Sequence, residues 1–172
     1  MVQIAMFTAV VAVLSQIAIP MPSGVPVTLQ TLAVALCGYV LGSKKGAVSL
    51  LVYALLGAVG APVFANFKGG LGAIAGPTGG FIWGFIFMAF LCGLGIESKH
   101  KWLAVVLGIA GVLVCHACGA AQFAIIKGNG FWSSALLVSV PYLVKDFVSV
   151  IIAFGAAALI RSRIKVTAAA NQ

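Results

Sequence analysis

The sequence predicts an all-α integral membrane protein, with six transmembrane helices in a single domain over residues 1–172. Two observations support this prediction. Hydrophobic residues make up 63% of the chain and charged residues only 7%, whereas a soluble domain needs about 25% charged residues to cover its surface. The hydrophobic residues also gather into six runs, each close to the roughly 20 residues that cross a bilayer. Lipid must therefore be the main solvent of this chain.

Six candidate spans follow one another along the sequence. They cover residues 2–19, 27–41, 46–60, 81–96 and 102–126, and a sixth span ends at residue 160. The proline-rich stretch of residues 20–26 ends the first span, because proline lacks the N–H that a helix needs. The sixth span has two alternative starts: near Ser133 with a kink at Pro141, or at Pro141 as the first helical residue.

Residues 61–80 form an irregular segment between the third and fourth spans. It holds six glycines and two prolines, too many for a stable helix. It is nevertheless apolar in part, with Val63, Phe64 and Leu71 among its residues. Lipid offers no hydrogen-bond partners to irregular backbone, so such a segment must be buried against other protein. We expect it to fold over one end of the bundle, as a lid or as the wall of a cavity.

Basic residues lie unevenly in the loops and predict the orientation of the chain. Seven of them fall on alternate turns and so share one side of the membrane: Lys44, Lys45, Lys99, Lys101, Arg161, Arg163 and Lys165. The other side holds only Lys68 and Lys127. The positive-inside rule places the basic side in the cytoplasm, so we expect both termini there and the irregular segment outside. The net charge of +8 thus reflects topology, and we do not expect nucleic-acid binding.

Lys145 and Asp146 are the charged pair that lies inside an apolar span. A charge at the centre of a membrane helix costs about 3 kcal/mol or more, and such residues usually face an interior site. Neighbouring residues on a helix point about 100° apart, so we expect each of the two to need another partner. The pair therefore predicts a ligand site on the sixth span, and a self-compensating ion pair remains the alternative.

Polar residues near the outer ends of the spans are further candidates for ligand contact. Asn66 can both donate and accept hydrogen bonds. Thr78 lies in a glycine-rich stretch that leaves backbone N–H groups open to a ligand. Gln30 opens the second span together with Thr28 and Thr31. Capping of this helix by Thr28 explains that residue as well as ligand contact does.

Other motifs do not predict catalysis or a metal centre. Residues 115–118 (Cys-His-Ala-Cys) have metal-like spacing, yet the only other histidine, His100, falls in a cytoplasmic loop, so we expect no metal. Glu97 falls at the cytoplasmic edge, which excludes a catalytic carboxylate pair with Asp146. The sequence contains no phosphate-binding loop that would bind and hydrolyse ATP. We therefore expect neither an enzyme nor a cofactor.

Three stretches resemble the BioY family in order and spacing: residues 25–31 (Val-Pro-Val-Thr-Leu-Gln-Thr), 60–65 (Gly-Ala-Pro-Val-Phe-Ala) and 76–81 (Gly-Pro-Thr-Gly-Gly-Phe). Members of this family are biotin-specific S components of energy-coupling factor (ECF) transporters in the prokaryotic cytoplasmic membrane. The resemblance implies a six-helix S-component bundle that captures biotin from outside. It also implies partnership with a membrane T component and with two cytoplasmic ATPases, which hydrolyse the ATP.

The resemblance implies roles for individual residues as well. S components contact the T component through an alanine-x-x-x-alanine motif in the first helix, which corresponds to Ala5 and Ala9. The family's sixth helix carries an Asp, matched by Asp146, and commonly a Lys three residues later, where this chain has Ser149. Lys145 lies one turn before Ser149 on the same helix face, and we expect it to substitute for that Lys.

Biotin offers matching chemistry: a ureido ring with two N–H donors and a carbonyl, an apolar body and a carboxylate. The resemblance implies that Asp146 accepts from the ureido N–H groups and that Lys145 pairs with the carboxylate or the ureido oxygen. Asn66 would take the remaining ureido partner, and the glycine-rich segment with Thr78 would close over the site. Three alternatives stay open: an S component for another small ligand, an intramembrane enzyme, and a carrier that needs no ATPase partner.

Overall fold

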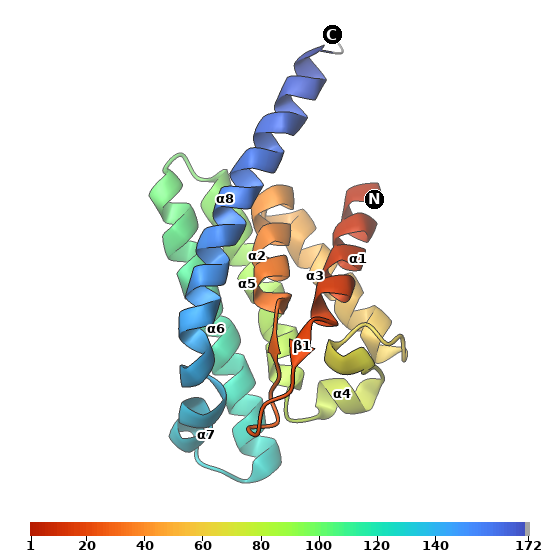
Figure 1. Cartoon of the computed structure of the whole chain (residues 1–172), viewed down its shortest axis with the longest axis vertical. Helices are drawn as coiled ribbons and strands as arrows, with labels where there is room; N and C mark the ends of the chain where they lie inside the picture. The colour runs from red at the N-terminus through yellow and green to blue at the C-terminus, as the bar shows by residue number, and fades with distance from the viewer. Residues whose placement is uncertain (171–172) are drawn as a thin grey trace.

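The computed structural model describes residues 1–170 of the chain, and the side chains of residues 1–163. It is a helical bundle in which the start of the first helix and the end of the last lie at the same end (Figure 1). Its α-helices are α1 (Val2–Ser15), α2 (Gln30–Leu41), α3 (Ser43–Ala58), α4 (Leu71–Ala75), α5 (Gly79–Glu97), α6 (Lys101–Lys127), α7 (Phe131–Val138) and α8 (Val140–Ala170). The all-helical membrane class that the sequence predicts is therefore confirmed.

Within the described part of the chain, three helices are long and apolar enough to cross a membrane on their own: α5, α6 and the part of α8 up to Arg163. Helices α1 and α2 are apolar but shorter, with 14 and 12 residues, and α3 has 16. These six helices make up most of the bundle, and α1 and α2 stop short of the end where the hairpin and α7 lie (Figure 1). The count of six transmembrane spans stays a prediction, since half of these helices fall below the roughly 20 residues that a span needs.

The predicted first span ends early, and a small hairpin follows it. Helix α1 stops at Ser15, and strand β1 (Ala18–Ile19) pairs antiparallel with β2 (Val27–Thr28). The prediction of helix up to residue 19 was therefore wrong. The prolines of residues 20–26 cannot donate to a helix, whereas the paired strands satisfy the backbone groups on either side of them. The hairpin lies at the end of the bundle opposite the N-terminus (Figure 1).

Glu97 explains why α3 begins three residues before the predicted span. Its two carboxylate oxygens accept hydrogen bonds from the backbone N–H and the hydroxyl of Ser43, both at 2.8 Å. The first N–H groups of a helix have no partner within the helix, so a carboxylate from α5 stabilises the start of α3. Lys44 and Lys45 consequently lie in the first turn of α3 rather than in a loop.

The last predicted span is divided in two. Helix α7 begins at Phe131 and ends at Val138, and α8 begins at Val140, with Ser139 between them outside the helical conformation. Of the two starts that the sequence allowed, the one at Pro141 is within a residue of the observed start. Helix α8 then continues past the rest of the bundle (Figure 1).

Glycines allow α5 and α6 to pack closely against each other. A Cβ added to Gly84 would lie 2.7 Å from Cys115 Cα, and one added to Gly80 would lie 2.2 Å from Cys118 O. Small residues at such spacing let membrane helices approach, because van der Waals contact replaces the hydrophobic effect there. The Gly80–Gly84 motif thus serves packing within the chain, and it fixes the helix pair that forms one wall of the cavity described below.

Gly84→Ala is expected to lower the free energy of unfolding by about 1–2 kcal/mol, because the new methyl group pushes against the backbone of α6. Gly155→Ala is the matched control, since a Cβ at Gly155 meets no atom within 4 Å. That control should gain about 0.5–1 kcal/mol from helix propensity alone. Thermal unfolding in detergent, monitored by size-exclusion chromatography, measures the stability of both variants. Equal melting temperatures for the two variants would contradict the close packing.

Candidate ligand-binding site

A cavity lies between the irregular segment of residues 61–80, named the outer segment below, the hairpin and helices α2, α5, α6 and α8. Apolar side chains form most of its wall: Phe64, Phe81, Ile82, Phe85, Met88, Val112 and Val138. Polar side chains form the rest of its lining, called the polar wall below: Thr28, Gln30, Thr31, Asn66, Lys68, Thr78, His116, Tyr142, Lys145 and Asp146. An apolar chamber with a few convergent polar groups is typical of a small-molecule site.

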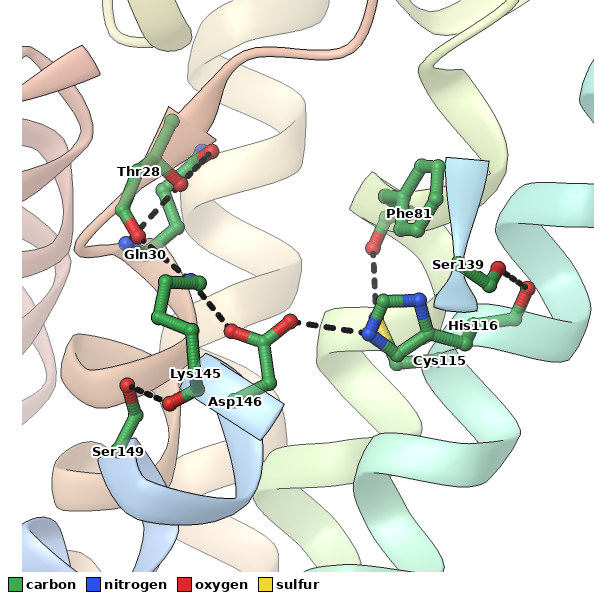
Figure 2. Close-up of polar contacts among 9 residues, drawn as sticks. All are labelled: Thr28, Gln30, Phe81, Cys115, His116, Ser139, Lys145, Asp146 and Ser149. Carbon is green, nitrogen blue, oxygen red and sulfur yellow. Dashed lines mark hydrogen bonds and ion pairs between the residues drawn. The ribbon is translucent and has the colours of Figure 1, made fainter. Parts of the chain in front are cut away.

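Asp146 belongs to the polar wall and is 4% exposed. Figure 2 shows its carboxylate, from α8, between the side chains of Lys145 and His116. One oxygen lies 2.9 Å from Nε2 of His116 on α6, and the other forms an ion pair with Nζ of Lys145. A buried carboxylate is costly unless it is paired, and here a cation and a hydrogen-bonding ring compensate it.

Lys145 also contacts the hairpin. Its Nζ donates a hydrogen bond to Thr28 O at 2.9 Å, which ties α8 to strand β2 (Figure 2). The sequence expectation that Lys145 and Asp146 would not pair with each other was wrong, because the long lysine side chain folds back to its neighbour. The expectation that each would need a further partner is confirmed, by Thr28 and His116 respectively.

The two ring nitrogens of His116 differ: Nε2 is hydrogen-bonded to Asp146, and Nδ1 has no hydrogen bond within the described part of the chain. An ionised Asp146 only accepts, so Nε2 of His116 must carry the hydrogen. Nδ1 is buried and finds no hydrogen-bond partner among the described residues. The ring packs edge-on against Phe81, with centroids 5.6 Å apart and an interplanar angle of 87°. This packing and the contact with Asp146 fix the orientation of the ring.

Gln30 and Thr28 form a second polar group at the start of α2. Thr28 Oγ1 donates to Gln30 Oε1 at 3.1 Å and accepts from the N–H of Gln30 at 3.2 Å. Gln30 Nε2 donates to the hydroxyl of Tyr53 at 2.9 Å. The N-cap residue of α2 is Leu29, without a side-chain cap, so the capping interpretation of Thr28 was wrong. The Thr28 hydroxyl instead lies beside the first helical residue and lines the cavity.

The structure brings most of the predicted site residues together around this cavity. Asp146, Lys145, Gln30, Asn66 and Thr78 all line it.

The other three predicted residues lie elsewhere. Ser149 is not among the lining residues, and its hydroxyl donates to Lys145 O on its own helix at 2.9 Å (Figure 2). Ala5 and Ala9 lie on the exposed face of α1.

Sequence reasoning missed His116, which it considered only as a metal ligand. The usable signal was the position of an ionisable ring inside an apolar span, which favours an interior polar contact whether or not a metal is present. Lys68 was also missed as a lining residue, whereas Tyr142, an aromatic residue that could be expected to wall a pocket, does line the cavity. The hydroxyl of Tyr142 donates to Val25 O at 2.6 Å and so holds the hairpin against α8.

The fold and the cavity define a class: a membrane-embedded protein that binds a small molecule with an apolar body and a polar end. The chain belongs to the BioY family, whose model matches residues 1–166.

Similar proteins have been named in several organisms. Over 120 residues the chain is 45% identical to a biotin transporter BioY of Thermotoga maritima, covering 69% of this chain and 70% of the relative. Over 164 residues it is 36% identical to a biotin transporter BioY of Rhodobacter capsulatus, covering 87% and 86%. Among solved structures it matches the crystal structure of the S-component for biotin from an ECF-type ABC transporter. That match has a TM-score of 0.82 and 25% identity, over 94% of this chain and 89% of the other.

Proposed function

We propose that this protein is the biotin-binding S component of an ECF-type uptake transporter. It has no catalytic activity of its own. It captures biotin from outside the cell, and a T component and two cytoplasmic ATPases then drive release inward. The observation that carries this proposal is the cavity with Asp146 at its polar wall, in a chain that belongs to the BioY family.

The composition of the cavity supports biotin as the ligand. Its aromatic and aliphatic wall suits the thiophane ring and the aliphatic chain, which are apolar. A carboxylate has about four lone-pair sites, so Asp146 can accept from a ureido N–H while it keeps Lys145 and His116. Asn66, on the outer segment, offers a donor to the ureido oxygen and an acceptor to the second N–H.

Lys145 also supports biotin as the ligand, although position 149 holds a serine where the family commonly has a lysine. The family resemblance leads us to expect a lysine at position 149, and the lysine at 145 instead reaches the carboxylate of Asp146 from the preceding residue. The ammonium group therefore stands in the same polar wall as the carboxylate. We propose that it binds the ureido oxygen or the ligand carboxylate after exchanging its contact with Thr28 O.

The proposed orientation places both termini in the cytoplasm of a prokaryotic cell, in its cytoplasmic membrane. The excess of basic residues at that end of the bundle supports it. The hairpin and the outer segment then face outside, at the end where the cavity lies. Ligand would enter between these two segments.

Equilibrium binding of biotin to the detergent-solubilised protein tests the proposal, by calorimetry or tryptophan fluorescence. We expect saturable, stoichiometric binding of biotin and none of other small vitamins at the same concentration. Failure of the folded protein to bind biotin, or preference for another vitamin, would refute the assignment of the ligand.

The exposed face of α1 is proposed as the contact with the T component. Ala5→Leu together with Ala9→Leu should abolish co-purification with the T component and the ATPases, because the larger side chains prevent close helix approach. Biotin binding by the isolated protein should stay unchanged. Ala158→Leu, the same change at an exposed position of α8 rather than α1, is the control and should retain the complex. An intact complex in the double alanine variant would exclude this surface.

A further inference from the structure

The end of α1 is attached to the outer segment by side-chain hydrogen bonds. Ser15 Oγ donates to Val63 O at 2.5 Å. The amide nitrogen of Gln16 lies 3.2 Å from Val63 O and 3.4 Å from Pro62 O, both acceptors in the outer segment. The amide oxygen of Gln16 accepts from the N–H of Phe67 at 2.9 Å. Ser15, the last residue of α1, and Gln16, which directly follows the helix, thus hold the segment that carries Asn66.

The backbone at Asn66 and Phe67 needs such support. Both residues have positive φ, 58° and 56°, and so adopt the left-handed conformation. Asparagine tolerates this conformation, but a bulky residue such as phenylalanine rarely adopts it unless its surroundings impose it. The side chain of Phe67 is 71% exposed and provides little of that constraint. The bond from Gln16 acts at the N–H of Phe67, on the peptide that joins these two residues.

We propose that Gln16 is a positioning residue for the ligand site. Its amide holds the left-handed peptide between Asn66 and Phe67, and so keeps Asn66 at the cavity wall. Gln16 itself is not among the lining residues, so it acts through Asn66. With this bond intact, the outer segment stays over the cavity and slows escape of the ligand to the outside. The inference rests on the proposed function for the contact of Asn66 with the ligand and for biotin as the probe.

A purely local role for Gln16 makes a different prediction. Its amide nitrogen also lies 3.0 Å from Ala12 O, one turn earlier in α1. If Gln16 served only to finish α1, its loss would not act through Asn66. A double-mutant cycle of Gln16 and Asn66 separates these two roles.

The first experiment compares Gln16→Met with Gln3→Met, the same change near the other end of the same helix. Gln3 accepts from Lys45 Nζ at 3.2 Å and has no contact with the outer segment among the described residues. Dissociation of radiolabelled biotin is followed after dilution. We expect dissociation to be about tenfold faster in Gln16→Met, as the loss of one or two hydrogen bonds implies, and unchanged in Gln3→Met. Equal dissociation rates in the two variants would overturn the inference.

The second experiment adds Asn66→Ala. This substitution alone should also accelerate dissociation, and the double variant with Gln16→Met should dissociate no faster than Asn66→Ala. If the double variant instead dissociates faster by the product of the two single factors, Gln16 does not act through Asn66, and the inference is overturned.

Hydrogen–deuterium exchange without ligand keeps the test independent of biotin. Backbone amides of residues 62–70 should exchange faster in Gln16→Met than in the parent protein, and at the parent rate in Gln3→Met. If the parent protein does not bind biotin, the proposed function fails while this measurement still tests Gln16. Unchanged exchange in Gln16→Met would refute the role of Gln16 whatever the ligand.

Discussion

Asp146→Asn is expected to weaken biotin binding about 100-fold, which corresponds to about 3 kcal/mol. Among the described residues that line the cavity, Asp146 alone carries an anionic group. Its replacement turns a charged acceptor into a neutral amide, and one end of that amide is a donor that faces the donors of the ligand. Calorimetric titration of the purified variant measures the loss directly.

Glu97→Gln is the matched control, because it makes the same carboxylate-to-amide change in the other acidic residue of the chain. Glu97 contacts Ser43 rather than the cavity, so the control should keep the affinity of the parent protein. Parent affinity in Asp146→Asn, with a normal elution profile, would exclude Asp146 from the binding site.

Lys145→Met is expected to lower the free energy of unfolding by about 3 kcal/mol, because it leaves the buried carboxylate of Asp146 without its cation. It also removes the hydrogen bond from α8 to Thr28 O, and so loosens the hairpin. Thermal unfolding in detergent should show a melting temperature lower by about 5–10 °C.

The double variant Lys145→Met with Asp146→Asn distinguishes charge compensation from packing. With the carboxylate neutralised, the missing ammonium no longer leaves a buried charge unpaired, so most of the lost stability should return. A double variant no more stable than Lys145→Met would show that the methylene chain or the Thr28 contact matters instead.

The long helices could be predicted from the sequence because extended apolar runs have few other uses. The predicted span of residues 102–126 differs from α6 by one residue at each end. The start of α3 could not be predicted, because it depends on the carboxylate of Glu97, more than fifty residues away along the chain. The hairpin could not be predicted either, since strands of two residues are too short to show an alternating pattern.

The polar site could be predicted in part for a similar reason. Lys145 and Asp146 stand out because any charge in an apolar span needs an interior partner. The partner on α6 does not stand out, because a helix that is apolar all round has no stripe to show which side faces inward. The rotation that turns His116 toward Asp146 is set by packing between helices, including the approach of Gly84 to Cys115.

The polar wall of the cavity is already hydrogen-bonded before a ligand arrives. Lys145 donates to Thr28 O, and Asp146 accepts from His116. A ligand oxygen that takes the ammonium must displace Thr28 O, so one hydrogen bond replaces another and little free energy is gained. The net free energy of binding must therefore come mainly from the burial of the apolar wall and the water that this burial releases. Such burial lowers the heat capacity of the complex, so the binding enthalpy should become more favourable as the temperature rises.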